Sequence, residues 1–364
     1  MFKLIFCCWC VVFSPLVLAQ SVAFINPGKT DEVYWVTSAR AMEAAAKSLG
    51  MSIEVHYAQR DHARTTDIAR ELTSRPVEKR PNYVVFSNDY ATGPELLRLF
   101  DSAGIKVFMA YSGIPQGTDR ESVGRPRERF KGWIGSLEPR AEDAGYLTAR
   151  ALIAEGRKAK AFAADGKLHM LAIAGDRSTP TSIYRNEGMQ RAVFEAKDVV
   201  LDQEIYAAWN REKAAEQSAW LYERFPQARL IWAGNDLMAF GAMQSWEKRG
   251  GKPGKDAWFT GVNTSAEAME NIQNGRLTAL AGGHFITGAW AVVMIYDYHH
   301  GRDFIDEGLE LNRPMFTLFS PDDAQRFMKR LGDLSTLTID FRSYSKVLNP
   351  KLKKYQFGFG QLLR

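Results

Sequence analysis

Polar and aromatic side chains that follow short apolar runs are the residues of this chain best suited to chemistry. They are Asn26, Asp89, Tyr111, Asn235, Asp236 and Asn263. Amides donate and accept hydrogen bonds and carboxylates accept them, so this set could bind the hydroxyl groups of a small polar molecule. Asn235 or Asp236 could instead cap the helix expected to begin at Leu237, and both roles can hold at once.

Three aromatic residues and one arginine could complete such a site. Tyr34 and Trp35 open the first expected helix, where they could stack on the flat face of a ligand or form a hydrophobic staple. Trp209 lies in a later loop and could stack from the other side, or pack in the core. Arg185 offers a planar fork of donors, although a surface pairing with Glu187 is the alternative.

Signals for catalysis are missing from the sequence. It has no Gly-x-Ser-x-Gly elbow, no phosphate-binding glycine loop and no His-Glu-x-x-His helix. The adjacent pair His299-His300 would point about 100° apart on a helix, which suits a surface position better than a metal site. The adjacent carboxylates of Asp322 and Asp323 suit the first turn of a helix, where they would interact favourably with the helix dipole, better than a catalytic pair. The sequence therefore predicts no catalytic residue, no metal and no cofactor, and a protein that is not an enzyme.

The first 19 residues have the pattern of a signal peptide. Lys3 precedes an apolar run, 4–18, that is too short to span a bilayer comfortably, and small residues lead to an expected cut after Ala19. All three cysteines lie in this segment, at positions 7, 8 and 10. We therefore expect an exported protein without disulfides or thiolate metal sites. Because no later stretch is apolar enough to cross a membrane, we do not expect a membrane-embedded protein.

Composition favours an ordinary globular protein with two lobes. Hydrophobic residues make up 46% and charged residues 24% of the 364 residues, and the net charge is +5. The basic residues are scattered, whereas nucleic-acid binding would favour a concentrated stripe, so nucleic acid is not expected as a partner. Removal of the signal leaves about 345 residues, enough for two lobes of ~150 each.

Strand and helix patterns alternate along the chain in two successive series. Expected strands are 22–26, 53–57, 83–86, 107–110, 133–135, 169–174, 199–206, 229–233, 258–262 and 277–281. Expected helices are 39–49, 67–74, 94–103, 141–155, 181–196, 211–225 and 237–248, with a loop at 113–130. This alternation predicts an α/β fold with two doubly wound parallel sheets. A ligand would then bind at the carboxyl ends of the strands, between two closing lobes.

Several segments together resemble one known family. They are Tyr34-Trp35, 185–189 (RNEGM), 233–242 (AGNDLMAFGA), 261–263 (GVN) and 274–277 (NGRL). Over about residues 21–305 the chain resembles the type I periplasmic binding proteins, which include ribose and galactose receptors and the ligand-binding cores of bacterial repressors. Pro27-Gly28 with 34–36 is similar to the receptors of this group that bind autoinducer and signal to a membrane sensor kinase.

The resemblance implies two lobes joined by three crossings, near 113–133, 284 and 319. It implies these divisions: 1–19 signal peptide; 20–130 first segment of the N-terminal lobe; 131–284 C-terminal lobe; 285–320 return of the N-terminal lobe; 321–364 completion of the C-terminal lobe and a tail.

The chain also departs from the family pattern at the expected pocket. Where sugar receptors carry an Asp-Arg pair after the fourth strand, this chain has Tyr111-Ser112, and Asn263 replaces an aspartate. Fewer charged groups suggest a small, neutral polar ligand such as a saccharide. The resemblance implies a monomeric solute-binding protein that serves an ABC transporter permease. The alternative is the ligand-binding subunit of a membrane sensor, a kinase or a cyclic-dinucleotide enzyme; the loop 113–130 and the tail 340–364 favour such specialised contacts.

Overall fold

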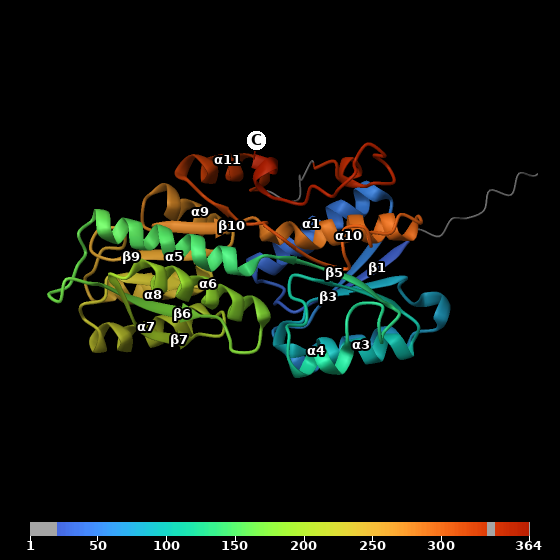
Figure 1. Ribbon diagram of the computed structural model, residues 1–364, viewed down its shortest axis with the longest axis horizontal. Coiled ribbons are helices and arrows are strands. Elements are labelled where there is room, and N and C mark those ends of the chain that lie inside the picture. Colours follow the sequence, from blue (N-terminus) through green and yellow to red (C-terminus); the bar gives the residue numbers. More distant parts are fainter. Residues whose placement is uncertain (1–19, 333–338, 364) are drawn as a thin grey trace, which may run out of the picture.

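The computed structural model describes residues 20–332 and 339–363, and it contains two six-stranded sheets, each covered by helices on both faces (Figure 1). The expected signal peptide and all three cysteines lie outside the described residues. The two-lobed α/β fold predicted from the alternating pattern is confirmed. In the described part of the chain, no helix combines the length and apolar character needed to cross a bilayer.

The first sheet is entirely parallel and has the strand order β11-β5-β4-β3-β1-β2. Its strands are β1 (Ser21–Asn26), β2 (Ser52–Tyr57), β3 (Tyr83–Phe86), β4 (Lys106–Ala110), β5 (Trp133–Pro139) and β11 (Glu310–Arg313). Its helices are α1 (Val33–Leu49), α2 (His62–Ser74), α3 (Gly93–Ser102), α4 (Thr118–Val123) and α10 (Thr287–His299). α4 occupies part of the segment that the sequence predicted as a loop.

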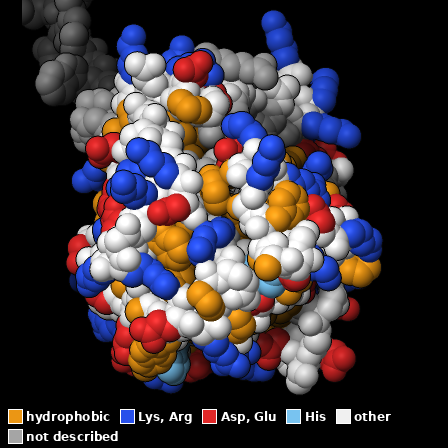
Figure 2. Space-filling view, turned by 90° about the vertical axis from the view of Figure 1, so that its left-hand side faces the viewer, with side chains coloured by type: hydrophobic (Ala, Val, Ile, Leu, Met, Phe, Trp, Pro, Cys, Tyr) orange, Lys and Arg blue, Asp and Glu red, His pale blue; other side chains and the backbone are white. Residues whose placement is uncertain are grey.

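The second sheet has the order β12-β10-β9-β8-β6-β7, and only β12 is antiparallel to its neighbour. Its strands are β6 (Leu168–Ala174), β7 (Val199–Tyr206), β8 (Leu230–Ala233), β9 (Trp258–Val262), β10 (Ala279–Gly282) and β12 (Thr317–Leu318). Its helices are α5 (Ala141–Lys158), α6 (Pro180–Ala196), α7 (Arg211–Arg224), α8 (Asp236–Lys248), α9 (Ala266–Gln273) and α11 (Pro321–Leu331). Acidic and basic side chains are interspersed on the outer end of this lobe (Figure 2).

Three crossings connect the lobes, and the first differs from its expected place. Because β5 pairs with β4 in the first sheet, the chain changes lobes between Pro139 and Ala141, after the boundary placed at residue 130. An apolar strand has the same pattern whichever sheet it joins, so the sequence could not assign it. The second crossing follows β10 at 283–286, and the third lies between β11 and β12 at 314–316.

The described tail, 339–363, packs on both lobes. The short turn η5 (Phe341–Tyr344) packs on α1 and α10, and η6 (Gly360–Leu363) contacts α11. Trp290 of α10, which is fully buried, is covered by Tyr344 at 4.6 Å and by Phe357, stacked at 5.2 Å between ring centres. The segment assigned to the C-terminal lobe at 321–364 therefore completes the surface of the N-terminal lobe as well.

The buried carboxylate of Asp297 anchors this tail to α10. It accepts hydrogen bonds from the Ser345 hydroxyl, from the backbone N–H of Lys346 at 2.7 Å and from the Tyr355 hydroxyl at 2.9 Å.

Replacing Asp297 by Asn keeps one acceptor oxygen but places an amide N–H group against the groups that donate to the carboxylate. We expect Asp297→Asn to lower the free energy of unfolding by about 2 kcal/mol, measured by urea titration of tryptophan fluorescence. The exposed control Asp67→Asn should change stability by less than about 0.5 kcal/mol; equal losses would contradict this anchoring role.

Candidate ligand-binding site

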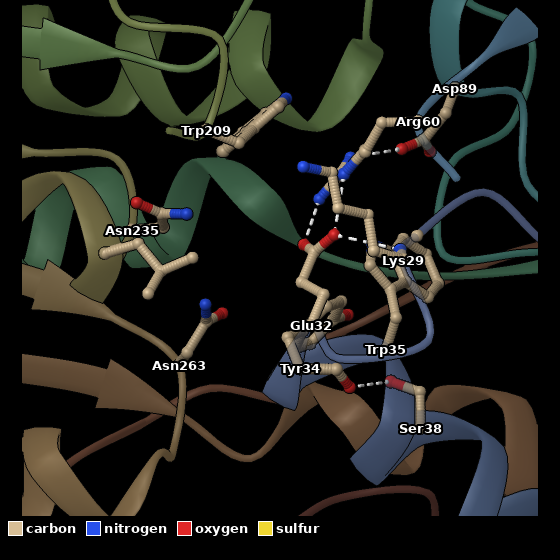
Figure 3. A network of polar contacts seen from close by, with 12 residues as sticks. Lys29, Glu32, Tyr34, Trp35, Ser38, Arg60, Asp89, Trp209, Asn235 and Asn263 are labelled. Carbon is tan, nitrogen blue, oxygen red and sulfur yellow. Dashed lines mark hydrogen bonds and ion pairs between the residues drawn. The ribbon is translucent and has the colours of Figure 1, made fainter. Parts of the chain in front are cut away.

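A narrow cavity with a volume of about 40 Å³ lies between the two lobes, at the carboxyl ends of the strands. Around it are Glu32, Tyr34, Trp35, Arg60, Asp89, Tyr111 and Ser112 of the first lobe and Thr179, Thr181, Arg185, Trp209, Asn235 and Asn263 of the second. Figure 3 shows Trp209, Asn235 and Asn263 facing Glu32, Arg60 and Tyr34 across open space. A larger hollow near Tyr83 and Lys106 lies at the opposite, amino ends of β3 and β4.

Trp35 and Trp209 stand on opposite walls, and each packs against a glycine that follows a strand. A Cβ on Gly28 would lie 2.2 Å from the Trp35 ring, and one on Gly175 would lie 2.2 Å from the Trp209 ring. Only residues without a side chain allow these rings to lie so close to the backbone. The Trp209 ring is held by Nε1, which donates to Asp176 at 2.7 Å. The Trp35 Nε1, also buried, has no hydrogen-bond partner in the described part of the chain.

The first-lobe wall carries a charged trio that the sequence analysis identified only in part. The Arg60 guanidinium donates to both carboxylate oxygens of Glu32, with Nε 2.8 Å from Oε2, and lies 3.5 Å from the Asp89 carboxylate. Gln59 and Arg60 both have left-handed backbone, with φ of 57° and 63°. Arg60 lies three residues after the end of β2, in the turn that follows the strand, so a search extended into that turn would have found it. Glu32 precedes α1 and shows no such signal.

Asp89 is held in place by the Ser87 hydroxyl, which donates to it at 2.6 Å. Burial raises the pKa of Asp89 from 3.8 to about 6, against the opposing effect of Arg60. The folded protein therefore holds this proton more tightly than the unfolded chain, and the free energy of unfolding should fall as the pH rises from about 4 to about 6.

Ligand affinity should depend on the same carboxyl group, but it should rise with pH where the free energy of unfolding falls. A ligand hydroxyl that donates to the ionised Asp89 needs the proton removed, so affinity should drop about tenfold from pH 8 to pH 5. Calorimetric titration at several pH values measures this. Asp89→Asn should make the profile flat; a profile unchanged by that substitution would exclude Asp89 as the titrating group.

Arg185 enters the cavity from α6 in the second lobe. It is 3% exposed, and its two terminal nitrogens donate to the Gly234 carbonyl oxygen at 2.7 Å and to His284 Nε2 at 2.9 Å. Neither of these partners is a carboxylate, and the Arg185 Nε has no partner among the described residues. Burial lowers the pKa of Arg185 to about 10, so the side chain stays charged at neutral pH.

The amides at the ends of β8 and β9 are fixed so that one donor and one acceptor remain free for the cavity. Asn235 Oδ1 accepts from the Met238 N–H at 2.8 Å, which caps α8 and leaves its NH₂ group (Figure 3). Asn263 Nδ2 donates to Asp236 at 2.9 Å, which leaves Oδ1. Asp236 does not line the cavity: it lies behind Asn263 and also accepts from Ser265. The structure thus places Asp236 where it positions Asn263.

Of the two remaining predicted residues, Asn26 lies outside the cavity lining, where it donates to the Trp35 carbonyl oxygen at 3.0 Å and accepts from the Gly28 N–H at 2.9 Å. The other, Tyr111, lines the cavity floor. Its ring meets Trp35 edge-on at 5.1 Å, and its hydroxyl donates to the Phe285 carbonyl oxygen at 3.3 Å. Burial raises the pKa of Tyr111 well above its usual value. Tyr34 lies beside it, so these aromatic residues form one continuous surface on the first-lobe wall.

Hydrogen bonds between the lobes show that the cleft is closed. The hydroxyls of Ser112 and Thr181 lie 2.8 Å apart, and the Tyr90 N–H donates to Thr179 Oγ1 at 3.4 Å. A ligand could reach the enclosed side chains only after the lobes separate. The described residues contain no group of histidine, cysteine or carboxylate side chains suited to a metal ion.

A family model described as a periplasmic binding protein domain matches residues 22–303. The chain belongs to this family. The resemblance drawn from the sequence is thereby confirmed, and the periplasmic binding protein family consists of solute-binding proteins rather than enzymes. A comparison with curated proteins finds no relative.

Solved structures similar to this periplasmic binding protein include proteins described as sugar-binding. A periplasmic sugar-binding protein from Pseudomonas fluorescens is 36% identical, with a TM-score of 0.85, over 95% of this chain and 100% of that one. An ABC transporter solute-binding protein from Actinobacillus succinogenes with bound D-allose is 16% identical, with a TM-score of 0.71, over 84% and 99%. One from Bacillus halodurans with bound myo-inositol is 16% identical, with a TM-score of 0.67, over 85% and 98%. The two latter likenesses concern the fold.

Proposed function

We propose that this protein captures a neutral saccharide or polyol in the periplasm, between its closing lobes, and presents it to the permease of an ABC transporter. The observation that carries the proposal is the cleft between the lobes, with Trp35 and Trp209 on opposite walls and polar side chains between them. The CH-rich face of a sugar ring packs on such aromatic surfaces.

The charges around the cavity balance without a charged ligand. Arg60 lies between the carboxylates of Glu32 and Asp89, and Arg185 supplies the remaining positive charge from the second lobe. Two guanidinium groups thus face two carboxylates. Hydroxyl groups can donate to the acidic wall and accept from Arg185 and Asn235, which suits a polyhydroxy compound. A micromolar dissociation constant corresponds to about 8 kcal/mol, which stacking and a few such hydrogen bonds can supply.

A panel of sugars tests the proposal directly. D-allose, D-tagatose, D-galactose, D-fucose and myo-inositol are apt compounds because neighbouring structures of the same fold hold several of them or close relatives. At a concentration a hundredfold above its dissociation constant, a true ligand stabilises the protein by about 2.7 kcal/mol, which a thermal-shift assay detects. The ligand should be recovered unchanged after incubation. Stabilisation by amino acids and by none of the sugars would contradict the proposal.

We propose a transporter partner in preference to a sensor because the tail, which favoured a specialised partner in the sequence analysis, packs on its own chain. Residues 341–357 cover Trp290, and Phe359 packs at the second crossing, so the described tail is accounted for by contacts within the chain. Cross-linking of the sugar-loaded protein to permease-containing membranes tests this choice. Cross-links to a sensor kinase alone would favour the alternative.

Export and oligomeric state complete the proposal. We propose cleavage of a signal peptide after Ala19, so N-terminal sequencing of periplasmic protein should begin at Gln20. We also propose that the protein acts as a monomer, because both walls of the cavity come from one chain. Size-exclusion chromatography with light scattering tests this.

A further inference from the structure

His284 lies in the second crossing between the lobes, outside the group of residues that line the cavity. It begins the short turn η3 (His284–Ile286), directly after β10, and is 2% exposed. The sequence analysis placed a crossing here but assigned the histidine no role. Its ring contacts a cavity residue from each lobe.

Towards the second lobe, the ring accepts a hydrogen bond from Arg185. The distance from the Arg185 terminal nitrogen to His284 Nε2 is 2.9 Å. Because a guanidinium can only donate, Nε2 must be the unprotonated nitrogen, and the ring proton sits on Nδ1. Burial and the neighbouring Arg185 charge both lower the pKa of His284, which keeps the ring neutral.

Towards the first lobe, the same ring stacks on Tyr34, with 4.7 Å between ring centres and 24° between planes. Phe316, in the third crossing, packs against it at 4.5 Å. The ring is thus held by residues of the first lobe, the second lobe and the crossing between them.

The tail fixes the backbone next to this ring. Gly283 has φ of 104°, and a Cβ there would lie 2.2 Å from the Phe359 ring. Phe359 also packs on Phe285 at 5.5 Å, so both neighbours of His284 are held from behind. The position of the imidazole is therefore set by the hinge backbone.

We propose that His284 is a positioning residue that aims the Arg185 guanidinium at the ligand and couples its placement to the closure of the lobes. The inference rests on the proposed function and extends it to the hinge. Arg185 has two acceptors outside the ligand, the carbonyl oxygen of Gly234 in its own lobe and His284. Only the hydrogen bond to His284 depends on the backbone conformation of the second crossing.

Two substitutions of His284 test its acceptor nitrogen and its aromatic ring separately. His284→Phe keeps an aromatic ring against Tyr34 and Phe316 but removes the acceptor, so we expect about tenfold or more weaker binding of the most stabilising sugar of the panel. His284→Gln loses the ring but keeps an acceptor oxygen, and binding should weaken by about threefold or less. Calorimetry measures both. A structural role alone would give the reverse order, with Phe tolerated and Gln damaging. That order, or equal losses, would overturn the proposal.

A ligand-free measurement keeps this inference separate from the saccharide proposal. In protein labelled with ¹⁵N at histidine and arginine, His284 should show a protonated Nδ1 and an unprotonated Nε2. The terminal nitrogens of Arg185, assigned with Arg185→Lys, should rotate slowly in the wild type and in His284→Gln but quickly in His284→Phe. If no sugar binds and these signals appear, the positioning contact holds and the ligand class is wrong. A protonated Nε2, or unchanged Arg185 rotation in His284→Phe, would overturn the positioning role.

Discussion

Replacing Arg185 by methionine should weaken binding of the best sugar of the panel by about a hundredfold or more. The substitution removes the only cation on the second-lobe wall among the described residues around the cavity, and with it the charge-assisted hydrogen bonds to ligand oxygens. Calorimetric titration measures the loss, and Arg191→Met is the matched control. Arg191 lies on the same helix, pairs with Glu142 and has a side chain 45% exposed, so its loss should leave affinity unchanged.

The same substitution should leave the melting temperature unchanged or raise it. Burial lowers the pKa of Arg185, which means that folding places the charged form in a less favourable environment than water. A neutral methionine of similar length relieves that cost. Weak binding in a stable protein would show that affinity, not folding, was lost. An affinity within about threefold of the wild type would remove Arg185 from the site.

Gly145→Val should lower the free energy of unfolding by about 3 kcal/mol. At Gly145 of α5, an added Cβ would lie 1.8 Å from the Arg185 carbonyl oxygen, and at Gly188 of α6 one would lie 2.1 Å from the Glu142 carbonyl oxygen. The two helices therefore touch backbone to backbone at two points. A valine at position 145 must push α6 away, and Arg185 with it, so sugar affinity should fall together with stability.

Urea titration of Gly145→Val against Ala154→Val tests this packing. Ala154 is exposed on the same helix, so valine there costs only its lower helix propensity, less than about 1 kcal/mol. Similar losses for the two variants would show that propensity, not helix contact, governs position 145.

Much of the fold and part of the site could be predicted because they follow local rules. Parallel strands end at a common edge, so residues after apolar runs such as Tyr111, Asn235 and Asn263 were expected together, and all line the cavity. Asp236 shows the limit of this rule: adjacent residues face different ways, and the cap geometry decides which one meets the cavity.

Other features depend on contacts between distant segments and have no local pattern. His284 acquires its place only when α6 and α1 approach the crossing from opposite lobes. Gly28 and Gly175 could be recognised as cradles for tryptophan only once the rings were placed. The location of β5 in the first sheet and the path of the tail also depend on pairings that apolar composition does not encode.

The interleaving of the two sheets has a consequence for how the polypeptide is made. β11 at 310–313 completes the first sheet, and Phe341, Tyr344 and Phe357 cover Trp290. The first lobe can therefore complete its packing only after strands β6 to β10 of the second lobe have been synthesised. Until then, apolar surface of the first lobe remains uncovered in the growing chain, and such surface is prone to aggregation.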